Sequence, residues 1–174
     1  MRIALVGGWT GGHIFPLLAI YKYFWKREKS SGSKIWSIEG KTRFIWVGEK
    51  NSLEQKIAKK NEIPFFTVHA GKLRRYFSLR TILEPFFILS GFFRSLYLLR
   101  SEKIDAVFSK GWYVSLPVAM AAWILRRPVY LHESDSIPGL ANRLVSRFAR
   151  TIFLTFSEAE KFFPKGKTKV IGQI

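Results

Sequence analysis

The sequence predicts an α/β fold in which helices cover both faces of an open parallel sheet. Short apolar segments rich in β-branched residues alternate along the chain with longer segments of helical periodicity. Alternation of this kind favours parallel strands that are joined by right-handed crossovers. Glycines cluster directly after the first apolar segment, where a strand of a Rossmann-like fold turns into a helix.

The predicted elements follow one another without a linker between them, so residues 1–174 are expected to form one domain. The polar segment Lys29–Gly40 is expected to be a flexible insertion after the first helix. The predicted strands are Arg2–Val6, Phe44–Val47, Phe65–Val68, Ala106–Ser109, Val129–Leu131, Thr151–Leu154 and Lys169–Ile171. The predicted helices are Ile14–Lys26, Leu53–Asn61, Leu79–Arg100, Ser115–Leu125, Gly139–Phe148 and Ser157–Phe162.

The first strand leads into a glycine-rich turn, Gly7–His13. Glycines let backbone N–H groups approach an anion, and the helix that follows adds a partial positive charge, so a phosphate or diphosphate is the expected ligand. His13 lies at the mouth of this turn, where an imidazole can move a proton. The spacing differs from the dinucleotide fingerprint and from a P-loop. A tight turn that binds no ligand is the alternative.

A second turn of the same kind, Ser109–Ser115, follows the predicted strand Ala106–Ser109. Ser115 is expected to cap the next helix, and Pro117 suits its first turn. Two such helix N-termini on neighbouring strands would hold one diphosphate between them. The alternative is a capped helix after a tight turn.

Polar residues also follow the predicted strand Val129–Leu131. Glu133, Ser134 and Asp135 are suited to binding sugar hydroxyls, and His132 adds a second imidazole. A buried histidine with a structural role is the alternative. The turn after this segment leads into a helix that carries Asn142.

The predicted helix Leu79–Arg100 has two apolar surfaces. Ile82, Phe86, Leu89, Phe93 and Leu96 recur at helical spacing and are expected to face the core. Basic and apolar side chains together on the other surface are typical of an interfacial membrane contact. The segment is too short and too charged to span a bilayer. A buried helix pair or a protein interface is the alternative. The predicted membrane patch consists of Lys72, Arg74, Arg75, Leu79, Arg80, Leu83 and Phe87.

The composition indicates an anionic partner. Lys and Arg number 29 against 12 Asp and Glu, which gives a net charge of +17, and 16% of the residues are aromatic. Nucleic acid, acidic lipid and a phosphorylated substrate all fit such a chain. The absence of cysteine excludes disulfides and thiolate zinc sites. No group of His, Asp and Glu has metal-ligand spacing, so no metal and no cofactor are expected.

Taken in order, these motifs resemble the N-terminal half of the MurG-type glycosyltransferases of glycosyltransferase family 28. The resemblance runs from Gly7–His13 through Val47-Gly48 and Gly71–Arg75 to Tyr113-Val114-Ser115, His132-Glu133 and Pro138–Arg143. It implies a GT-B fold, of which this chain would be the acceptor-binding half. The family moves N-acetylglucosamine from UDP-N-acetylglucosamine to an undecaprenyl-diphosphate-linked sugar, an inverting reaction that makes lipid II for peptidoglycan.

The resemblance also implies roles for particular residues. His13 would be the general base for the acceptor hydroxyl. The segment around Leu79–Phe87 would meet an anionic membrane, which places the protein peripherally on its cytoplasmic face. The acceptor diphosphate would be held by Gly8, Thr10, Gly11, Gly12, Lys110, Gly111, Tyr113 and Ser115. The acceptor sugar and its cleft would involve His132, Glu133, Ser134, Asp135 and Asn142.

The sequence departs from the family pattern at several positions. Trp9 is added between Gly8 and Thr10, Lys110 and Trp112 take glycine-rich positions, and Asp135 replaces an amide. No part of the chain matches a donor-binding domain, so a separate donor-binding domain or subunit is expected, and the isolated chain is expected to have little transferase activity.

Three other functions stay open. The chain fits a non-catalytic subunit that binds lipid diphosphates or acts as a scaffold. It also fits the membrane half of a split glycosyltransferase with a different acceptor. An RNA-binding function would be supported by the charge alone. The chain lacks the known RNA-binding motifs, so no nucleic acid partner is expected.

Overall fold

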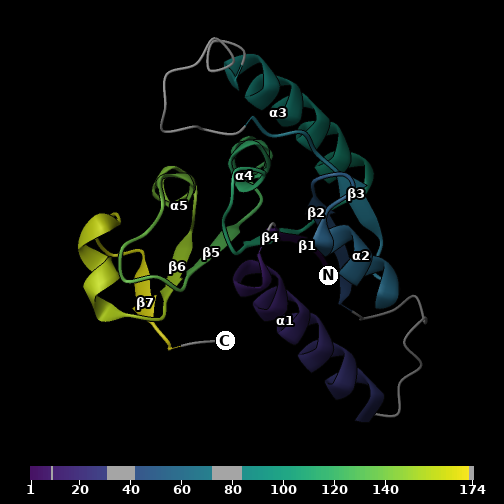
Figure 1. The fold of residues 1–174 in the computed structure, drawn as a ribbon, viewed down its shortest axis with the longest axis horizontal. Helices are drawn as coiled ribbons and strands as arrows, with labels where there is room; N and C mark the ends of the chain where they lie inside the picture. The colour runs from purple at the N-terminus through teal and green to yellow at the C-terminus, as the bar shows by residue number, and fades with distance from the viewer. Residues whose placement is uncertain (9, 31–41, 72–83, 173–174) are drawn as a thin grey trace.

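A single parallel sheet forms the centre of the molecule (Figure 1). The structure is a computed structural model that describes residues 1–8, 10–30, 42–71 and 84–172. Within these residues, seven strands follow the order β3-β2-β1-β4-β5-β6-β7, which is the Rossmann order extended by one strand. The strands are β1 (Arg2–Val6), β2 (Arg43–Gly48), β3 (Phe65–Thr67), β4 (Ala106–Ser109), β5 (Val129–Glu133), β6 (Thr151–Leu154) and β7 (Thr168–Val170).

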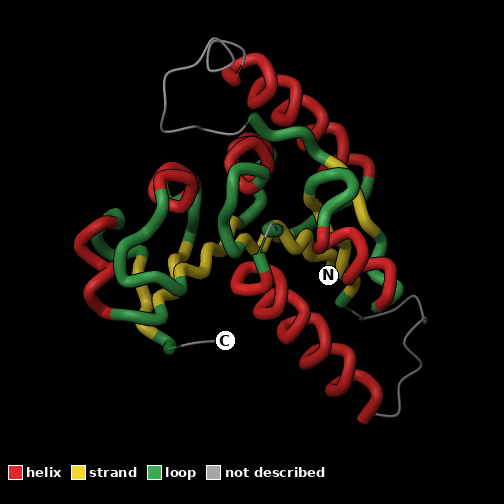
Figure 2. The backbone as a smooth tube through the Cα atoms, in the orientation of Figure 1, coloured by secondary structure: helices red, strands yellow, loops and turns green. Residues whose placement is uncertain are grey.

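Helices cover both faces of this sheet, which confirms the predicted fold class (Figure 2). Helices α1 and α2 pack on one face, and α3, α4 and α5 pack on the other. The strand order reverses between β1 and β4, so right-handed crossovers before and after this point fall on opposite faces. The helices are α1 (Gly11–Ser30), α2 (Leu53–Lys60), α3 (Glu84–Ser101), α4 (Ser115–Ile124), α5 (Leu140–Val145) and the 3-10 helix η2 (Ser157–Phe162).

Alternation along the strands divides the core into two clusters. Ala4 and Val6 of β1 belong to the cluster under α3, α4 and α5, whereas Leu5 belongs to the cluster under α1 and α2. Neighbouring side chains of a strand point to opposite faces, so a strand buried on both sides must be apolar throughout. The second cluster also holds the fully buried Trp46, whose indole N–H donates to the carbonyl of Gly7 at 3.1 Å. This bond fixes the end of β1, where the first glycine turn begins.

Several predicted boundaries shift in the structure. Helix α1 begins at Gly11 rather than Ile14 and continues through Lys29 and Ser30, the first two residues of the predicted insertion. The rest of that insertion, residues 31–40, lies outside the described residues. Strand β5 extends to Glu133, so His132 and Glu133 end the strand instead of following it. Helix α5 is shorter than predicted and ends at Val145.

The predicted core face of α3 is wrong at three of its positions. Phe86, Leu89 and Phe93 are 67%, 51% and 60% exposed. The buried positions of α3 are instead Glu84, Gly91, Ser95, Leu98 and Leu99. Phe92 packs against the core together with Leu96 and Ile88. Ile82 and the other residues of 72–83 lie outside the described part of the chain.

Candidate active site

The two glycine turns lie side by side because β1 and β4 are neighbours in the sheet. The amide of Lys110 donates to the carbonyl of Val6 at 2.9 Å. A Cβ atom on Gly7 would lie 3.2 Å from the Cβ of Lys110. Gly7 has φ of +154°, which other residues rarely adopt, so glycine permits both this conformation and the close contact. The predicted pairing of the two turns is therefore present.

Helix α1 presents its first amides at the carboxyl edge of the sheet. The amides of His13 and Ile14 both donate to the carbonyl of Thr10, at 3.0 and 3.1 Å. Gly11 and Gly12 are the first two residues of this helix, where a backbone N–H has no carbonyl acceptor within the helix. A Cβ on Gly12 would meet only the Thr10 hydroxyl, at 3.9 Å. This helix start is therefore open to an anion.

His13 is held by a hydrogen bond to its own turn. Its Nδ1 lies 2.7 Å from the hydroxyl of Thr10. When Nδ1–H donates to that hydroxyl, Nε2 carries the lone pair that a general base needs. Burial lowers the pKa of His13, the charge of Lys110 lowers it further, and Asp135 opposes both. The ring is thus favoured in its neutral form, which is the form that accepts a proton.

The second turn has an unusual backbone. Gly111 has φ of +100° and Trp112 has φ of +78°. A Cβ on Gly111 would lie 2.1 Å from Oδ1 of Asn142, so only glycine fits between β4 and α5. The indole of Trp112 lies 6.0 Å from the ring of His13 and 4.8 Å from that of Tyr113. The turn therefore brings two aromatic rings to the mouth of α1.

Ser115 does not cap α4 as predicted. It is the first residue of the helix, and the preceding Val114 occupies the cap position without a side-chain bond. The Ser115 hydroxyl instead donates back to the carbonyl of Gly111. The amide of Gly111 donates to the hydroxyl of Ser109 at 3.1 Å. Both serines thus stabilise the turn from within.

Lys110 lies beneath the site, with only 1% of its surface exposed. Burial lowers its pKa, while the carboxylates of Glu133 and Asp135 raise it. A buried ammonium is stable only beside opposite charge. Lys110 is therefore the cation between the two turns and the end of β5.

The end of β5 forms a polar network with α5. Oε2 of Glu133 accepts from the side-chain amide of Asn142 at 2.8 Å, and Oε1 accepts from the amide of Asp135 at 2.9 Å. Glu133 and Asn142 are buried, Ser134 is partly exposed and Asp135 is exposed. Asp135 is thus the acidic group of this segment that solvent and ligand reach.

His132 is fully buried on the same strand. Its Nε2 lies 3.4 Å from the hydroxyl of Thr155, and the ring also interacts with the backbone of Gly172. Burial lowers its pKa to about 4, and Lys110 contributes in the same direction. A ring with no exposed surface lies behind the site rather than in direct reach of a ligand.

Glu54 was missed as a site residue by sequence reasoning. Its carboxylate is 1% exposed, and a Cβ on Gly8 would lie 2.2 Å from its Oε1. The same oxygen accepts from the amide of Glu49 at 3.2 Å. Glu54 is the second residue of α2, so the signal in the sequence was a lone acidic residue in the first turn of a helix. Only the strand order brings it beside the first glycine turn.

The predicted membrane patch is described in part. Phe87 is 50% exposed and lies among exposed side chains of α3. The residues Lys72, Arg74, Arg75, Leu79, Arg80 and Leu83 lie outside the described residues. No helix among the described residues is long and apolar enough to span a membrane. The described residues also contain no group of three His, Asp or Glu side chains able to hold a metal ion.

The strand order defines a Rossmann-like domain, and two helix N-termini lie at the carboxyl edge of its sheet. The model of the glycosyltransferase family 28 N-terminal domain matches residues 3–154, and the chain belongs to this family.

Two bacterial relatives show the extent of the match. The chain is 41% identical over 171 residues to UDP-N-acetylglucosamine–N-acetylmuramyl-(pentapeptide) pyrophosphoryl-undecaprenol N-acetylglucosamine transferase 3 of Bacillus thuringiensis (strain Al Hakam). It is 42% identical to the transferase of the same name from Legionella pneumophila (strain Corby). These matches cover 98% of the chain but only 45% and 44% of the two relatives. The chain therefore spans about half the length of these relatives.

Solved structures agree with the family assignment. Acinetobacter baumannii MurG superposes with a TM-score of 0.75 at 26% identity, covering 99% of this chain and 45% of that one. The UDP-GlcNAc 2-epimerase of Methanocaldococcus jannaschii superposes with a TM-score of 0.67 at 15% identity, covering 99% of this chain and 47% of that one. The second match shows a shared fold alone.

Proposed function

We propose that this chain is the acceptor-binding, membrane-facing half of an N-acetylglucosaminyltransferase that acts on a polyprenyl-diphosphate-linked sugar. The observation that carries the proposal is the pairing of the two glycine turns, in which His13 of the first turn lies 6.0 Å from Trp112 of the second and Lys110 of the second turn is buried. The relatives carry names that state a pyrophosphoryl-undecaprenol acceptor and an N-acetylglucosamine transfer. Lipid I, converted to lipid II, is accordingly the proposed acceptor.

The diphosphate of the acceptor is proposed to bind at the N-terminus of α1. The amides of Gly11 and Gly12 point to the carboxyl edge of the sheet, where a helix start favours negative charge. Lys110 of the second turn adds a cation, and Glu133 and Asp135 favour its charged form against the effect of burial. The hydroxyl of Thr10 is already bonded to His13, so its part is to orient the ring.

His13 is proposed to accept the proton of the acceptor hydroxyl as that oxygen attacks the anomeric carbon of the donor sugar. The bond from this carbon to the UDP oxygen breaks on the opposite side, which inverts the anomeric centre. A neutral imidazole is needed for this step, and burial together with Lys110 favours it. Asp135, exposed at the same edge, is placed to bind sugar hydroxyls.

The membrane contact is proposed to be the outer face of α3. Phe86, Phe87, Leu89, Phe93 and Tyr97 are each at least 50% exposed along this helix. An exposed apolar stripe of this size, on a chain of net charge +17, suits peripheral binding to an anionic bilayer. We place the protein on the cytoplasmic face of the cell membrane on this basis.

The donor sugar nucleotide is proposed to bind a separate domain or subunit. The relatives are about twice as long as this chain. On the face that carries α1, the described residues place no helix over β5 and β6 (Figure 2). Phe108, Tyr130 and Phe153 form an aromatic row on this open face. A helix of the donor half would bury these rings, as both faces of parallel sheets are normally covered.

The test supplies a donor half as a separate protein. The remainder of the Bacillus thuringiensis relative, expressed as a separate protein, is added to this chain with a lipid I analogue and radiolabelled UDP-N-acetylglucosamine. Product should form only when both proteins are present. His13→Ala should then lower turnover by about 100-fold or more, the usual contribution of a general base. His69→Ala is the matched control, because His69 is exposed and lies after β3.

The same assay separates catalysis from binding alone. The indole of Trp112 lies 6.0 Å from the His13 ring, at a position where a glycine would leave room for a diphosphate. This observation favours a second candidate function, that of a non-catalytic subunit that binds lipid diphosphates. Such a subunit would bind the lipid diphosphate, and His13→Ala would leave product formation unchanged. Transfer by the chain alone would contradict the division into two halves.

A further inference from the structure

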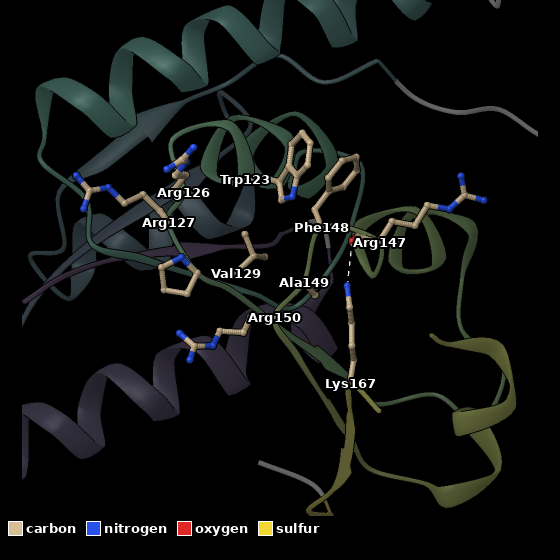
Figure 3. Close-up of a pocket in the computed structure, with 10 residues that line it drawn as sticks. Trp123, Arg126, Arg127, Val129, Arg147, Phe148, Ala149, Arg150 and Lys167 are labelled. Carbon is tan, nitrogen blue, oxygen red and sulfur yellow. Dashed lines mark hydrogen bonds between the residues drawn. The ribbon is translucent and has the colours of Figure 1, made fainter. Parts of the chain in front are cut away.

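A second concentration of positive charge lies at the amino edge of the sheet, away from the candidate active site. A pocket of about 500 Å³ opens between the end of α4, the start of β5, the turn after α5 and the residue before β7 (Figure 3). Val129 lines this pocket at one end of β5, and Glu133 lies in the active site at the other. At about 3.3 Å per residue the two sites are roughly 13 Å apart. Its cations are Arg126, Arg127, Arg147, Arg150 and Lys167.

The backbone brings these cations together from segments distant in the sequence. Helix α4 ends in a tight turn in which the amide of Arg127 donates to the carbonyl of Ala122 at 2.8 Å. This turn places Arg126 at φ of +54°, the left-handed conformation that glycine normally supplies. The amide of Arg150 donates to the carbonyl of Val129 at 2.8 Å, which sets it beside the turn. Glu62 and Lys103 have the same left-handed conformation after α2 and α3.

Charge and shape in the pocket suit a phosphate group. No acidic residue is among those that line it. Figure 3 shows Arg126, Arg127 and Arg150 extending on one side of the pocket and Arg147 extending on the other. Guanidinium groups bind phosphate oxygens through paired N–H bonds, and several of them around one cavity repel one another until an anion binds.

Two aromatic rings and a lysine complete the walls of this open pocket. The rings of Trp123 and Phe148 meet edge to face at 5.9 Å and form its apolar wall. The ammonium of Lys167 donates to the carbonyl of Arg147 at 3.1 Å, which fixes its position in the pocket. We propose that this pocket binds a multivalent phosphate anion, either free or as the headgroup of a phosphomonoester lipid, at a site separate from the active site.

This inference does not rest on the proposed function, and a site-resolved titration keeps the two apart. The whole chain, labelled with nitrogen-15, is titrated with inorganic pyrophosphate at constant ionic strength, with sodium sulfate as the comparison anion. The amides of Arg126, Arg127 and Val129 and those of 147–150 should shift and saturate with pyrophosphate. Shifts at Gly11 and Gly12 report the active site independently. Absence of saturable shifts at the pocket amides would overturn the inference even if the active-site amides respond.

Two sets of variants assign the response to the pocket. Arg127→Gln with Arg150→Gln should weaken pyrophosphate binding at the pocket amides by about tenfold or more, since each lost guanidinium removes charge-assisted bonds. Lys56→Gln with Lys59→Gln removes two exposed cations of α2 and should change the affinity less than about twofold. Arg126→Gly relieves the left-handed strain, so it should raise Tm while weakening binding. If the α2 variant loses as much pyrophosphate affinity, the effect comes from net charge alone and the proposed site is wrong.

Vesicles identify the source of the phosphate. Phosphatidylcholine vesicles carry either phosphatidic acid, a phosphomonoester, or phosphatidylglycerol, a phosphodiester, at equal surface charge. A lipid headgroup site predicts tighter binding to phosphatidic acid, which the Arg127→Gln and Arg150→Gln pair abolishes. If the site binds free phosphate instead, the native chain and the double variant should bind the two kinds of vesicle equally. Pyrophosphate should still saturate the pocket amides of the native chain in the titration. The proposal is refuted if the chain shows no preference for phosphatidic acid and pyrophosphate binding does not saturate.

Discussion

Burial lowers the pKa of both histidines at the carboxyl edge of the sheet, and Lys110 lowers them further. It is buried, and its charge lowers the pKa of His13 and of His132. Lys110→Met keeps the length of the side chain and removes the charge, so both pKa values should rise. Burial still lowers them, so neither reaches the value of a free imidazole. Histidine proton NMR measures both, and Lys56→Met on α2 is the control that should leave them unchanged.

His132 makes the stability of the fold depend on pH. Its pKa is about 4 in the folded chain against 6.5 for the free side chain. Between these values the unfolded chain binds more protons, so the free energy of unfolding should fall as the pH drops from 6.5 to 4, by about 3 kcal/mol. The lowered pKa of His13 acts in the same direction.

Urea denaturation across this pH range measures the loss. His132→Gln removes the titrating group, so the difference between the native chain and this variant isolates its contribution from that of the carboxylates. A difference that stays constant from pH 7 to 4.5 would contradict the assigned pKa.

Helix α3 shows what apolar periodicity does not reveal. Its buried seam contains Gly91 and Ser95, one turn apart, and the Ser95 hydroxyl donates to the carbonyl of Gly91 at 2.7 Å. A Cβ on Gly91 would lie 2.1 Å from the carbonyl oxygen of His69. Small residues let the helix approach the backbone, whereas Phe86 and Phe93 are too large for this contact. Large apolar residues therefore predicted the wrong face.

Gly91→Ala should destabilise the fold despite its better helix propensity. The new methyl group collides with the His69 carbonyl, which costs about 1–3 kcal/mol, and the propensity gain of at most about 1 kcal/mol offsets only part of this. Thermal unfolding should show a lower Tm. Ser90→Ala, at an exposed position of the same helix, is the control and should not lower Tm. A Tm equal to that of the native chain would show that the backbone at His69 yields easily.

The outer face of α3 gives a second element-scale prediction. Phe86→Ser with Phe93→Ser removes two exposed rings, so flotation with anionic vesicles should fall by about tenfold while Tm stays within about two degrees. Tyr23→Ser on α1 is a control, because Tyr23 is 61% exposed on the opposite side of the sheet. Equal flotation of all three proteins would remove the membrane face from α3.

At the scale of the molecule, the sequence predicted the order and type of the elements but not which of them meet. Gly7–His13 and Ser109–Ser115 were expected to pair because a strand–helix repeat places them at one edge, and they do. Glu54 was missed because its contact with Gly8 depends on β2 lying beside β1. The burial of His132 depends likewise on Thr155 and the segment after β7. Contacts between distant segments need the sheet order, which local patterns do not contain.

The open sheet face carries the last prediction, on how two halves would assemble. Ile152 and Leu154 of β6 face α4 and α5, so Phe153 points to the opposite side, where its ring stacks with those of Tyr130 and Phe108. Phe153→Ser shortens this aromatic row, and because Phe153 pairs with His132 in the sheet, the concentration dependence of turnover is needed to separate weaker assembly from a local defect. Turnover with the separately expressed donor half should fall by about tenfold at low concentration and recover at high concentration, because assembly is weakened rather than chemistry.

Tyr130→Phe keeps the stacked ring and serves as the matched control, with turnover unchanged. Vesicle flotation should be equal in both variants, since α3 lies on the other face of the sheet. Loss of turnover that persists at saturating donor half would place the defect within this domain instead. If Phe153→Ser has the same turnover as the native chain at every concentration, the donor half docks elsewhere. The aromatic row would then need another partner.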